Sequence, residues 1–188
     1  MHGKPRVIAG CRKADIAASA HGYDLLVTTG GASVGEHDLI QQALGGEGFE
    51  LGFWKIAMRP GKPLIWGRLG RVPVLGLPGN PVSALVCAII FLLPALARLS
   101  GLPGAPTPSR RVICATALAE NDRRADFLRA SLDADAEGHI TVRPFAVQDS
   151  SMLATLARAD ALVLRAPFAP ALPAGAEVEA IMLGELGV

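Results

Sequence analysis

The chain has 188 residues, of which 51% are hydrophobic and 19% charged, and its 18 basic and 17 acidic side chains give a net charge of +1. This composition is typical of a globular protein with one large domain or two small ones, and it excludes a disordered tail. A chain so close to neutral has no bulk positive field for nucleic acid, so we expect no nucleic-acid partner and a locally built site for any anion.

Cysteine usage and the N-terminus favour a cytoplasmic protein. The three cysteines, Cys11, Cys87 and Cys114, are odd in number, far apart and without metal-site spacing, which is typical of reduced thiols. The first residues lack the long apolar core of a signal peptide. One apolar segment, 82–99, contains a serine, a proline and an arginine, so we interpret it as a buried core helix and expect no membrane partner.

The first hundred residues alternate between short apolar runs and glycine-rich or proline-rich loops, which predicts an α/β domain. In chain order we expect a strand, a short helix, three further strands and a long helix, at 24–29, 38–44, 49–57, 63–67, 72–77 and 82–99. Little chain precedes the first clear strand. The α/β domain is therefore expected to lack its first βα unit.

A linker rich in glycine and proline at 101–108 predicts a second domain. We place the boundary after residue 104, so that 1–104 form the α/β domain and 105–188 the second domain. The latter has short β-like segments at 111–118, 126–132, 139–144, 161–165 and 177–183, with a hairpin turn at 133–138. This pattern predicts a small β-barrel or sandwich.

The most informative motif is Thr-Thr-Gly-Gly-Ala-Ser-Val-Gly-Glu-His-Asp at 28–38, directly after the apolar run 25–27. Its glycines allow close approach of the backbone to a ligand, its hydroxyls add donors, and its carboxylates suit a hard cation such as Mg²⁺. The candidate binding residues are Thr29, Gly30, Gly31, Ser33, Gly35, Glu36 and Asp38. Such a loop suits a phosphate, although a strand-to-helix turn without a ligand explains the glycines alone equally well.

Three cations surround a Pro-Gly turn in the second motif, Trp-Lys-Ile-Ala-Met-Arg-Pro-Gly-Lys-Pro at 54–63. Lys55 ends a predicted strand, while Arg59 and Lys62 flank Pro60 and Gly61, whose backbone could cradle a phosphate. A solvated turn with ordinary surface charges is the alternative.

The third motif, Gly-Leu-Pro-Gly-Asn-Pro-Val-Ser at 76–83, precedes the long helix. A helix N-terminus favours phosphate, and the candidates are Pro78, Gly79, Asn80, Pro81 and Ser83. Helix capping by Asn80, with Pro81 at the first helical position, is the alternative. All three motifs follow strands of one predicted sheet, so we expect them to gather at its C-terminal edge.

In this order and spacing, the three motifs closely resemble those of the molybdopterin molybdenumtransferase family, which includes gephyrin. The resemblance runs from about residue 24 to the C-terminus and includes 124–129, 148–151 and 172–178 in the second domain. It implies a three-layer molybdopterin-binding domain followed by a small β-barrel. Family members usually have Gln-Gly-Ser where this chain has Gln148-Asp149-Ser150, and often lysine at the position of Arg59.

The resemblance implies a transferase of molybdenum cofactor biosynthesis, which turns adenylylated molybdopterin and molybdate into molybdenum cofactor and AMP with the help of Mg²⁺. It assigns metal binding to Asp38 and Glu36, and catalysis to these two residues with Lys55 and Lys62. It assigns the molybdopterin ligand to Thr29, Gly30, Gly31, Ser33, Gly35, Arg59, Pro60, Gly61, Pro78, Gly79, Asn80, Pro81 and Ser83.

Full-length relatives have two further domains and the opening βα unit before the point at which the resemblance begins. Two alternatives are therefore a molybdopterin-binding module without transfer activity and an inactive truncated remnant. A third is an enzyme like the molybdopterin adenylyltransferases, against which the Arg-Pro-Gly-Lys loop and the β-domain speak. A homodimer and a molybdopterin adenylyltransferase partner are further expectations.

Overall fold

The computed structural model describes residues 22–30, 48–103, 106–134 and 137–187. The chain forms two compact units, Met1–Ile56 with Pro63–Gly79 and Ala57–Lys62 with Asn80–Val188. The second unit thus contains the Arg-Pro-Gly-Lys turn and the long helix as well as the C-terminal strands. The domain boundary after residue 104 stays a prediction.

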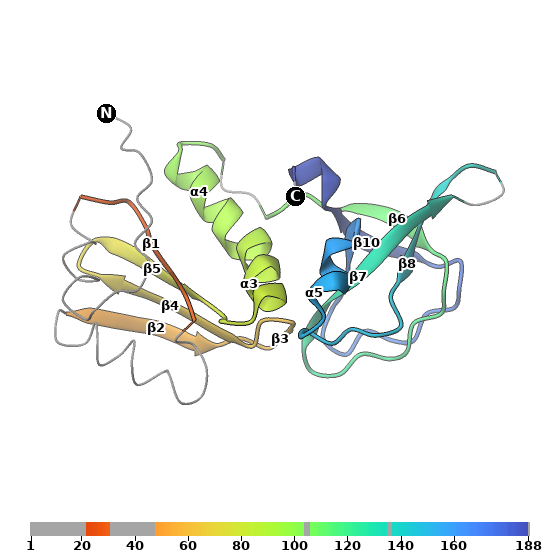
Figure 1. The fold of residues 1–188 in the computed structure, drawn as a ribbon, viewed down its shortest axis with the longest axis horizontal. Coiled ribbons are helices and arrows are strands. Elements are labelled where there is room, and N and C mark those ends of the chain that lie inside the picture. Colours follow the sequence, from red (N-terminus) through yellow and green to blue (C-terminus); the bar gives the residue numbers. More distant parts are fainter. Residues whose placement is uncertain (1–21, 31–47, 104–105, 135–136, 188) are drawn as a thin grey trace. The chain divides into compact units, whose positions relative to one another are not determined.

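The first unit contains a four-stranded sheet with the order β1-β5-β4-β2 (Figure 1). β1 (Leu26–Thr29) pairs in parallel with β5 (Val72–Leu77), and β4 (Pro63–Leu69) pairs antiparallel with both β5 and β2 (Phe49–Lys55). Strands β1, β5 and β2 therefore run in the same direction. Their carboxyl ends lie at the same edge of the sheet, where an open α/β sheet binds its ligands.

The core of this sheet comes from its most apolar strands. β5 has the sequence Val-Pro-Val-Leu-Gly-Leu, an apolar run that is typical of a central strand. The buried cluster consists of Ile65, Leu69 and Val74, against which Leu26, Phe49 and Trp54 pack. The strands predicted at 24–29, 63–67 and 72–77 are confirmed, and the one predicted at 49–57 ends at Lys55.

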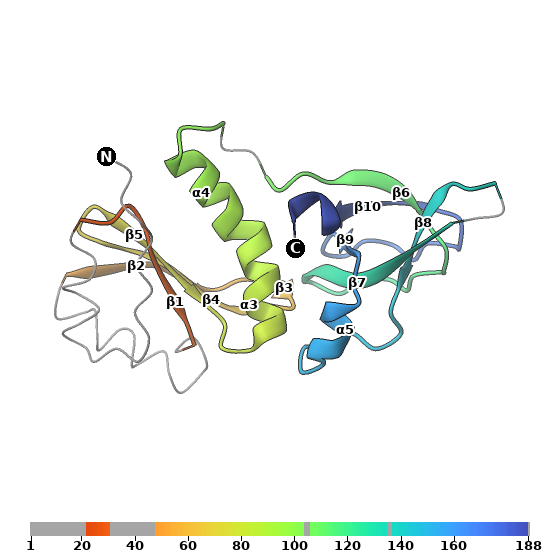
Figure 2. The ribbon, with the colours of Figure 1, turned by 45° about the horizontal axis from the view of Figure 1, so that its top comes forward.

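A long helix follows β5 and begins at the predicted position. It consists of α3 (Pro81–Cys87), the π-helical segment η2 (Ala88–Leu92) and α4 (Leu93–Leu99), which form one rod in Figure 2. Buried residues occur in α3 and at Ile89 in η2, whereas α4 has none. The predicted burial therefore holds only for the first half of the helix.

By length and composition alone, the stretch Pro81–Leu99 could cross a membrane, and 28% of its apolar window is buried. The core helix of a water-soluble protein has the same length and composition, so this feature is weak evidence for a span.

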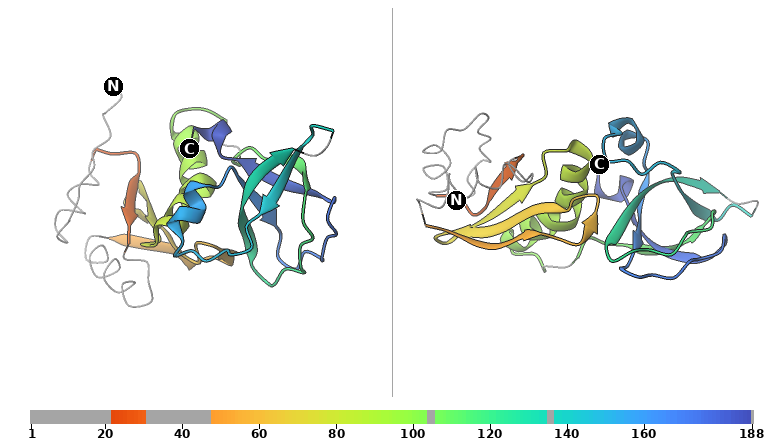
Figure 3. Two further views of the ribbon diagram at one scale, coloured as in Figure 1. Left: turned by 45° about the vertical axis from the view of Figure 1, so that its right-hand side comes forward. Right: turned by 90° about the horizontal axis from the view of Figure 1, so that it is seen from below.

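The second unit contains a closed five-stranded β-barrel (Figure 3). Its strands are β6 (Arg110–Cys114), β7 (Ala125–Ala134), β8 (Ile140–Pro144), β9 (Ala161–Arg165) and β10 (Glu177–Met182). They follow the order β7-β8-β6-β10-β9, and the pairing of β7 with β9 closes the ring. Of the two predicted architectures, the barrel is confirmed. Two short helical segments, α5 (Leu153–Ala157) and η3 (Gly184–Leu186), were not predicted.

Small apolar side chains fill the barrel. Its buried cluster consists of Val112, Cys114, Ala130, Val142, Ala161, Val163, Val178, Ala180 and Met182. Buried and exposed positions alternate over the first four residues of β10, with Val178 and Ala180 turned inward.

The short strand β3 (Met58–Arg59) corrects one prediction. It pairs in parallel with β7, with Met58 opposite Ala125 and Arg59 opposite Asp126. The Arg-Pro-Gly-Lys turn therefore follows a strand of the barrel's sheet, and the expectation that all three motifs follow strands of one sheet is wrong. Apolar alternation within 49–57 carries no information about this partner, which lies 67 residues further along the chain.

Candidate functional site

The first and third motifs meet at the carboxyl edge of the first unit's sheet. The amide of Gly30 donates a hydrogen bond to the carbonyl oxygen of Leu77 at 3.2 Å. A Cβ atom added to Gly79 would lie 3.3 Å from the Cα atom of Gly30, so only a residue without a side chain allows this approach without a shift. For the described part of the first motif, which ends at Gly30, the predicted approach to the third motif is confirmed.

Thr28 lies beside these loops, opposite Gly76 in the pairing of β1 with β5. Its Oγ1 atom is buried and has no hydrogen-bond partner among the residues that the structure describes. Buried hydroxyls are normally paired, because an unpaired one loses its bonds to water. Thr28 is therefore a candidate donor to a ligand at this edge, which its position in the motif suggested but did not single out.

Replacing Thr28 by valine tests this role, because valine keeps the shape of the side chain and removes the hydroxyl. We expect the free energy of unfolding to stay constant or to rise by about 1 kcal/mol, since an unpaired buried hydroxyl is removed. Urea unfolding monitored by circular dichroism measures this change. A clear loss of stability would show that the hydroxyl already has a partner within the folded chain.

The remaining residues of the first motif, Gly31, Ser33, Gly35, Glu36 and Asp38, lie outside the described residues, as does the helix predicted at 38–44. Within the described ranges, no group of three or more His, Cys, Asp or Glu side chains could hold a metal ion. The assignment of Mg²⁺ to Glu36 and Asp38 stays a prediction.

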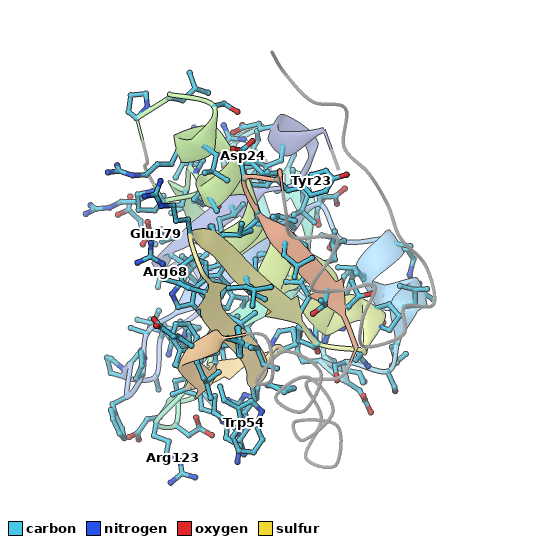
Figure 4. The ribbon with its side chains drawn as sticks, turned by 90° about the vertical axis from the view of Figure 1, so that its left-hand side faces the viewer. Tyr23, Asp24, Trp54, Arg68, Arg123 and Glu179 are labelled. Atoms are coloured by element: carbon cyan, nitrogen blue, oxygen red, sulfur yellow. The ribbon has the colours of Figure 1, made fainter. Side chains whose placement is uncertain are left out.

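Lys55 ends β2 at the same edge of the sheet as the ends of β1 and β5. One strand separates β2 from β5, so the backbone of Lys55 lies about 10 Å from that of β5. Its Nζ atom lies 3.8 Å from the centre of the Trp54 ring, and Figure 4 shows Trp54 among the side chains of β2. Lys55 is thus a cation held at the site's edge by an aromatic ring.

The start of the long helix is a capped N-terminus. The Asn80 side chain accepts a hydrogen bond from the Ser83 amide at 3.1 Å, and Pro81 occupies the first turn. Ser83 itself is 6% exposed. Capping therefore accounts for Asn80, Pro81 and the amide of Ser83, and a ligand role for these residues stays a prediction.

Arg59 has a different environment from the one expected of a ligand-binding cation. Its Nε and Nη2 atoms donate to the two carboxylate oxygens of Asp126 at 2.7 and 2.5 Å. Nη1 donates to Asp122 and Nη2 also to Asn121, both at 3.3 Å. The hydrogen bond to Asp126 is the main cause that raises the pKa of Arg59 above its usual value, and the charges of Asp126 and Asp122 add to it despite partial burial. The three acceptor residues lacked any recognisable spacing signal in the sequence.

In the rest of the Arg-Pro-Gly-Lys turn, Gly61 is buried whereas Lys62 is exposed to solvent. Gly61 is buried at a φ of +113°, and its carbonyl oxygen lies 3.8 Å from the Sγ atom of Cys87. Burial raises the pKa of the Cys87 thiol to about 12, so it stays protonated at neutral pH. Lys62 is exposed and has no ion pair among the described residues.

Asp122 bridges Arg59 and Arg124, and its Oδ2 atom lies 2.9 Å from Nη2 of Arg124. The side-chain and backbone hydrogen bonds from Arg124 lower the pKa of Asp122 from 3.8 to about 2. A lowered carboxyl pKa stabilises the fold above pH 3.8, and this contribution is lost as the pH falls through 2. We expect the stability difference between the wild-type chain and Asp122→Asn to shrink between pH 4 and pH 2, as measured by urea unfolding at each pH.

A buried arginine supports the loop at 148–151. Arg129 is 0% exposed, and Gln148 accepts from its backbone amide at 3.0 Å and from its Nε at 3.2 Å. Nη1 donates to the carbonyl oxygen of Asp149 at 2.9 Å. Nη2 is buried without a partner among the described residues. Arg129 therefore holds the backbone of this loop through the carbonyl oxygen of Asp149.

Two family models match the chain. One, described as "Probable molybdopterin binding domain", matches residues 12–98, and the other, "MoeA C-terminal region (domain IV)", matches residues 111–183. The two matched segments follow the order of an α/β domain and a barrel, which agrees with the fold described above.

Relatives and solved structures agree with these models. The molybdopterin molybdenumtransferase of Haemophilus influenzae is 37% identical over 153 residues, which cover 81% of this chain and 37% of that protein. Gephyrin of Dictyostelium discoideum is 28% identical over 186 residues, which cover 87% of this chain and 26% of that protein. The crystal structure of a molybdopterin biosynthesis MoeA protein from Pyrococcus horikoshii has a TM-score of 0.71 at 28% identity, covering 90% of this chain and 40% of that one. The chain thus spans less than half the length of these proteins.

Proposed function

Because this chain belongs to the molybdopterin molybdenumtransferase and gephyrin family, whose C-terminal portion it matches, we propose that it binds molybdopterin and acts in molybdenum cofactor biosynthesis. The observation that carries this proposal is the meeting of two glycine-containing loops at the carboxyl edge of the sheet, where Gly30 bonds to Leu77 and Gly79 packs on Gly30. Backbone amides at such an edge suit a phosphate group.

In the reaction that we propose, molybdate and adenylylated molybdopterin give molybdenum cofactor and AMP. The backbone of 29–35 holds the ligand's phosphate, Thr28 donates its hydroxyl, and Lys55 places positive charge beside the anion. The family resemblance adds Lys62 as a further cation for the ligand. Pro78 and Gly79 shape the floor of the site, because Pro78 is buried and Gly79 lies against Gly30.

The resemblance assigns Mg²⁺ to Glu36 and Asp38, whose carboxylates have the chemistry that a hard cation requires. Bound there, the ion would offset charge on the phosphoryl groups. Both residues lie outside the described ranges. A homodimer, a molybdopterin adenylyltransferase partner and a cytoplasmic location complete the proposal, supported by the family resemblance and the cysteine usage.

The test is molybdate-dependent release of AMP from adenylylated molybdopterin by the purified chain, beside Asp38→Ala. We expect release by the wild-type chain and a loss of at least about 100-fold in the variant, because the carboxylate that positions the charged groups is gone. Equal release by Asp38→Ala would remove Asp38 from the mechanism. Binding of the ligand without release by the wild-type chain would favour a binding module without transfer activity.

A further inference from the structure

We propose that Arg59 is a positioning residue, which fixes the Arg-Pro-Gly-Lys turn to strand β7 and leaves Lys62 as the turn's cation for an anionic ligand. The ligand part of this inference rests on the proposed function, whereas the part about the turn does not. Arg59 was expected from the sequence to contact the ligand directly, so the structure assigns it a different task.

Each of the three nitrogen atoms of the Arg59 guanidinium donates a hydrogen bond within the protein. Its Nε and Nη2 form a fork on Asp126, Nη1 reaches Asp122, and Nη2 also reaches Asn121. Arg124 completes the cluster through Asp122, so two arginines face two aspartates and their charges cancel. An incoming anion would meet no net positive charge at this cluster, and it would compete with the carboxylates of Asp126 and Asp122 for the Arg59 guanidinium.

The partners of Arg59 are themselves held in place. The Asp126 side chain is 10% exposed, so its charge depends on Arg59 for compensation. Asn121 is 8% exposed, and its Nδ2 atom donates to the carbonyl oxygens of Arg124, Arg165 and Ala166. The fork therefore joins the turn to a hydrogen-bonded part of the second unit.

The backbone pairing of β3 with β7 is too short to fix the turn by itself. β3 has two residues, and among the described residues its ladder on β7 is extended by the single hydrogen bond from the Ala125 amide to the Ala57 carbonyl oxygen at 2.9 Å. A strand this short has little stability of its own. In register, Arg59 lies directly opposite Asp126, so the side-chain fork strengthens the same pairing.

The segment that the fork positions is Pro60–Gly61–Lys62. Gly61 packs on Cys87, which is 0% exposed, and Lys62 comes next with its side chain in solvent. Loosening the fork should therefore uncover Cys87 and move Lys62. Lysine in place of Arg59 keeps the charge but cannot form the fork on Asp126 while also reaching Asp122 and Asn121.

Thiol labelling of the folded chain tests the position of the turn without any ligand. Labelling by iodoacetamide is measured at Cys87 and at Cys114, a buried thiol of the barrel core, by mass spectrometry. We expect Arg59→Lys and Asp126→Asn each to raise the ratio of Cys87 to Cys114 labelling about tenfold, because the opening is local. Arg143→Lys, at an exposed ion pair with Asp133, should leave the ratio unchanged. An unchanged ratio in both fork variants would overturn the proposal.

Binding of adenylylated molybdopterin, measured by equilibrium dialysis, tests whether Arg59 contacts the ligand. The two roles of Arg59 predict opposite changes in affinity for Asp126→Asn. If Arg59 bound the anion, removing the charge of Asp126 would tighten binding; a positioning role predicts that Asp126→Asn weakens it at least about threefold. Lys62→Gln should also weaken binding, and more at low salt than at high salt. Tighter binding by Asp126→Asn would overturn the inference. Absence of binding to the wild-type chain would refute the proposed function, while the labelling ratio would still decide the role of Arg59 in the turn.

Discussion

Replacing Gly61 by alanine is expected to lower the free energy of unfolding by about 3 kcal/mol. Two causes add here. Gly61 has a φ of +113°, where an L-residue is strained, and an added Cβ would lie 2.5 Å from the Sγ atom of Cys87. The turn is buried at this point, so neither cause can be relieved by movement into solvent. Urea unfolding of the purified variant measures the loss.

Two matched variants separate these causes. Gly70→Ala also introduces a side chain at a positive φ, +60°, but with no atom within 4 Å, so its cost of about 1 kcal/mol reports the backbone alone. Adding Cys87→Ala to Gly61→Ala removes the clash with sulfur and should recover part of the loss. Equal stability of Gly61→Ala and Gly70→Ala would contradict the close packing of the turn on Cys87.

Truncation of Arg129 to alanine is expected to cost about 3 to 4 kcal/mol, because it empties a fully buried volume and removes the bonds to Gln148 and Asp149. Urea unfolding measures this effect as well. Arg111→Ala is the control, since Arg111 is 82% exposed in an ion pair at 3.8 Å and should contribute less than about 0.5 kcal/mol.

Methionine at position 129 tests whether volume or charge matters more. Among the described residues no carboxylate accepts a hydrogen bond from Arg129, and burial lowers the pKa of its guanidinium. A buried charge without a carboxylate partner contributes little net stability. We therefore expect Arg129→Met to lose about 1 kcal/mol, much less than the alanine variant. Equal losses in both variants would show that the hydrogen bonds of the guanidinium, rather than its volume, stabilise the barrel.

Local patterns in the sequence predicted much of the fold. The apolar runs at 72–77 and 161–165 coincide with β5 and β9, and Asn80 caps the long helix as expected. Strong apolar patterns bounded by proline or glycine determine such elements locally. The helix α5 was missed because five residues are too few for a helical period to appear.

Long-range pairings could not be predicted in the same way. The closure of the barrel through β7 and β9, and the pairing of β3 with β7, depend on partners far along the chain. The role of Arg59 is a consequence of that pairing, because only the fold brings Asp126 opposite it. At the site, the approach of Gly30 after β1 to the loop after β5 was predicted from the parallel direction of the two strands. That the Thr28 hydroxyl has no partner among the described residues could be seen only from the packing around it.

Binding of molybdopterin at the carboxyl edge of the sheet can be tested by comparing how adenylylated molybdopterin binds to the wild-type chain and to Gly79→Val. The valine Cβ would lie 3.3 Å from the Gly30 Cα atom and separate the two loops. We predict saturable binding by the wild-type chain and at least about tenfold weaker binding by the variant, with little change in unfolding. Failure of the folded wild-type chain to bind, or equal binding by the two proteins, would contradict a molybdopterin site at this edge.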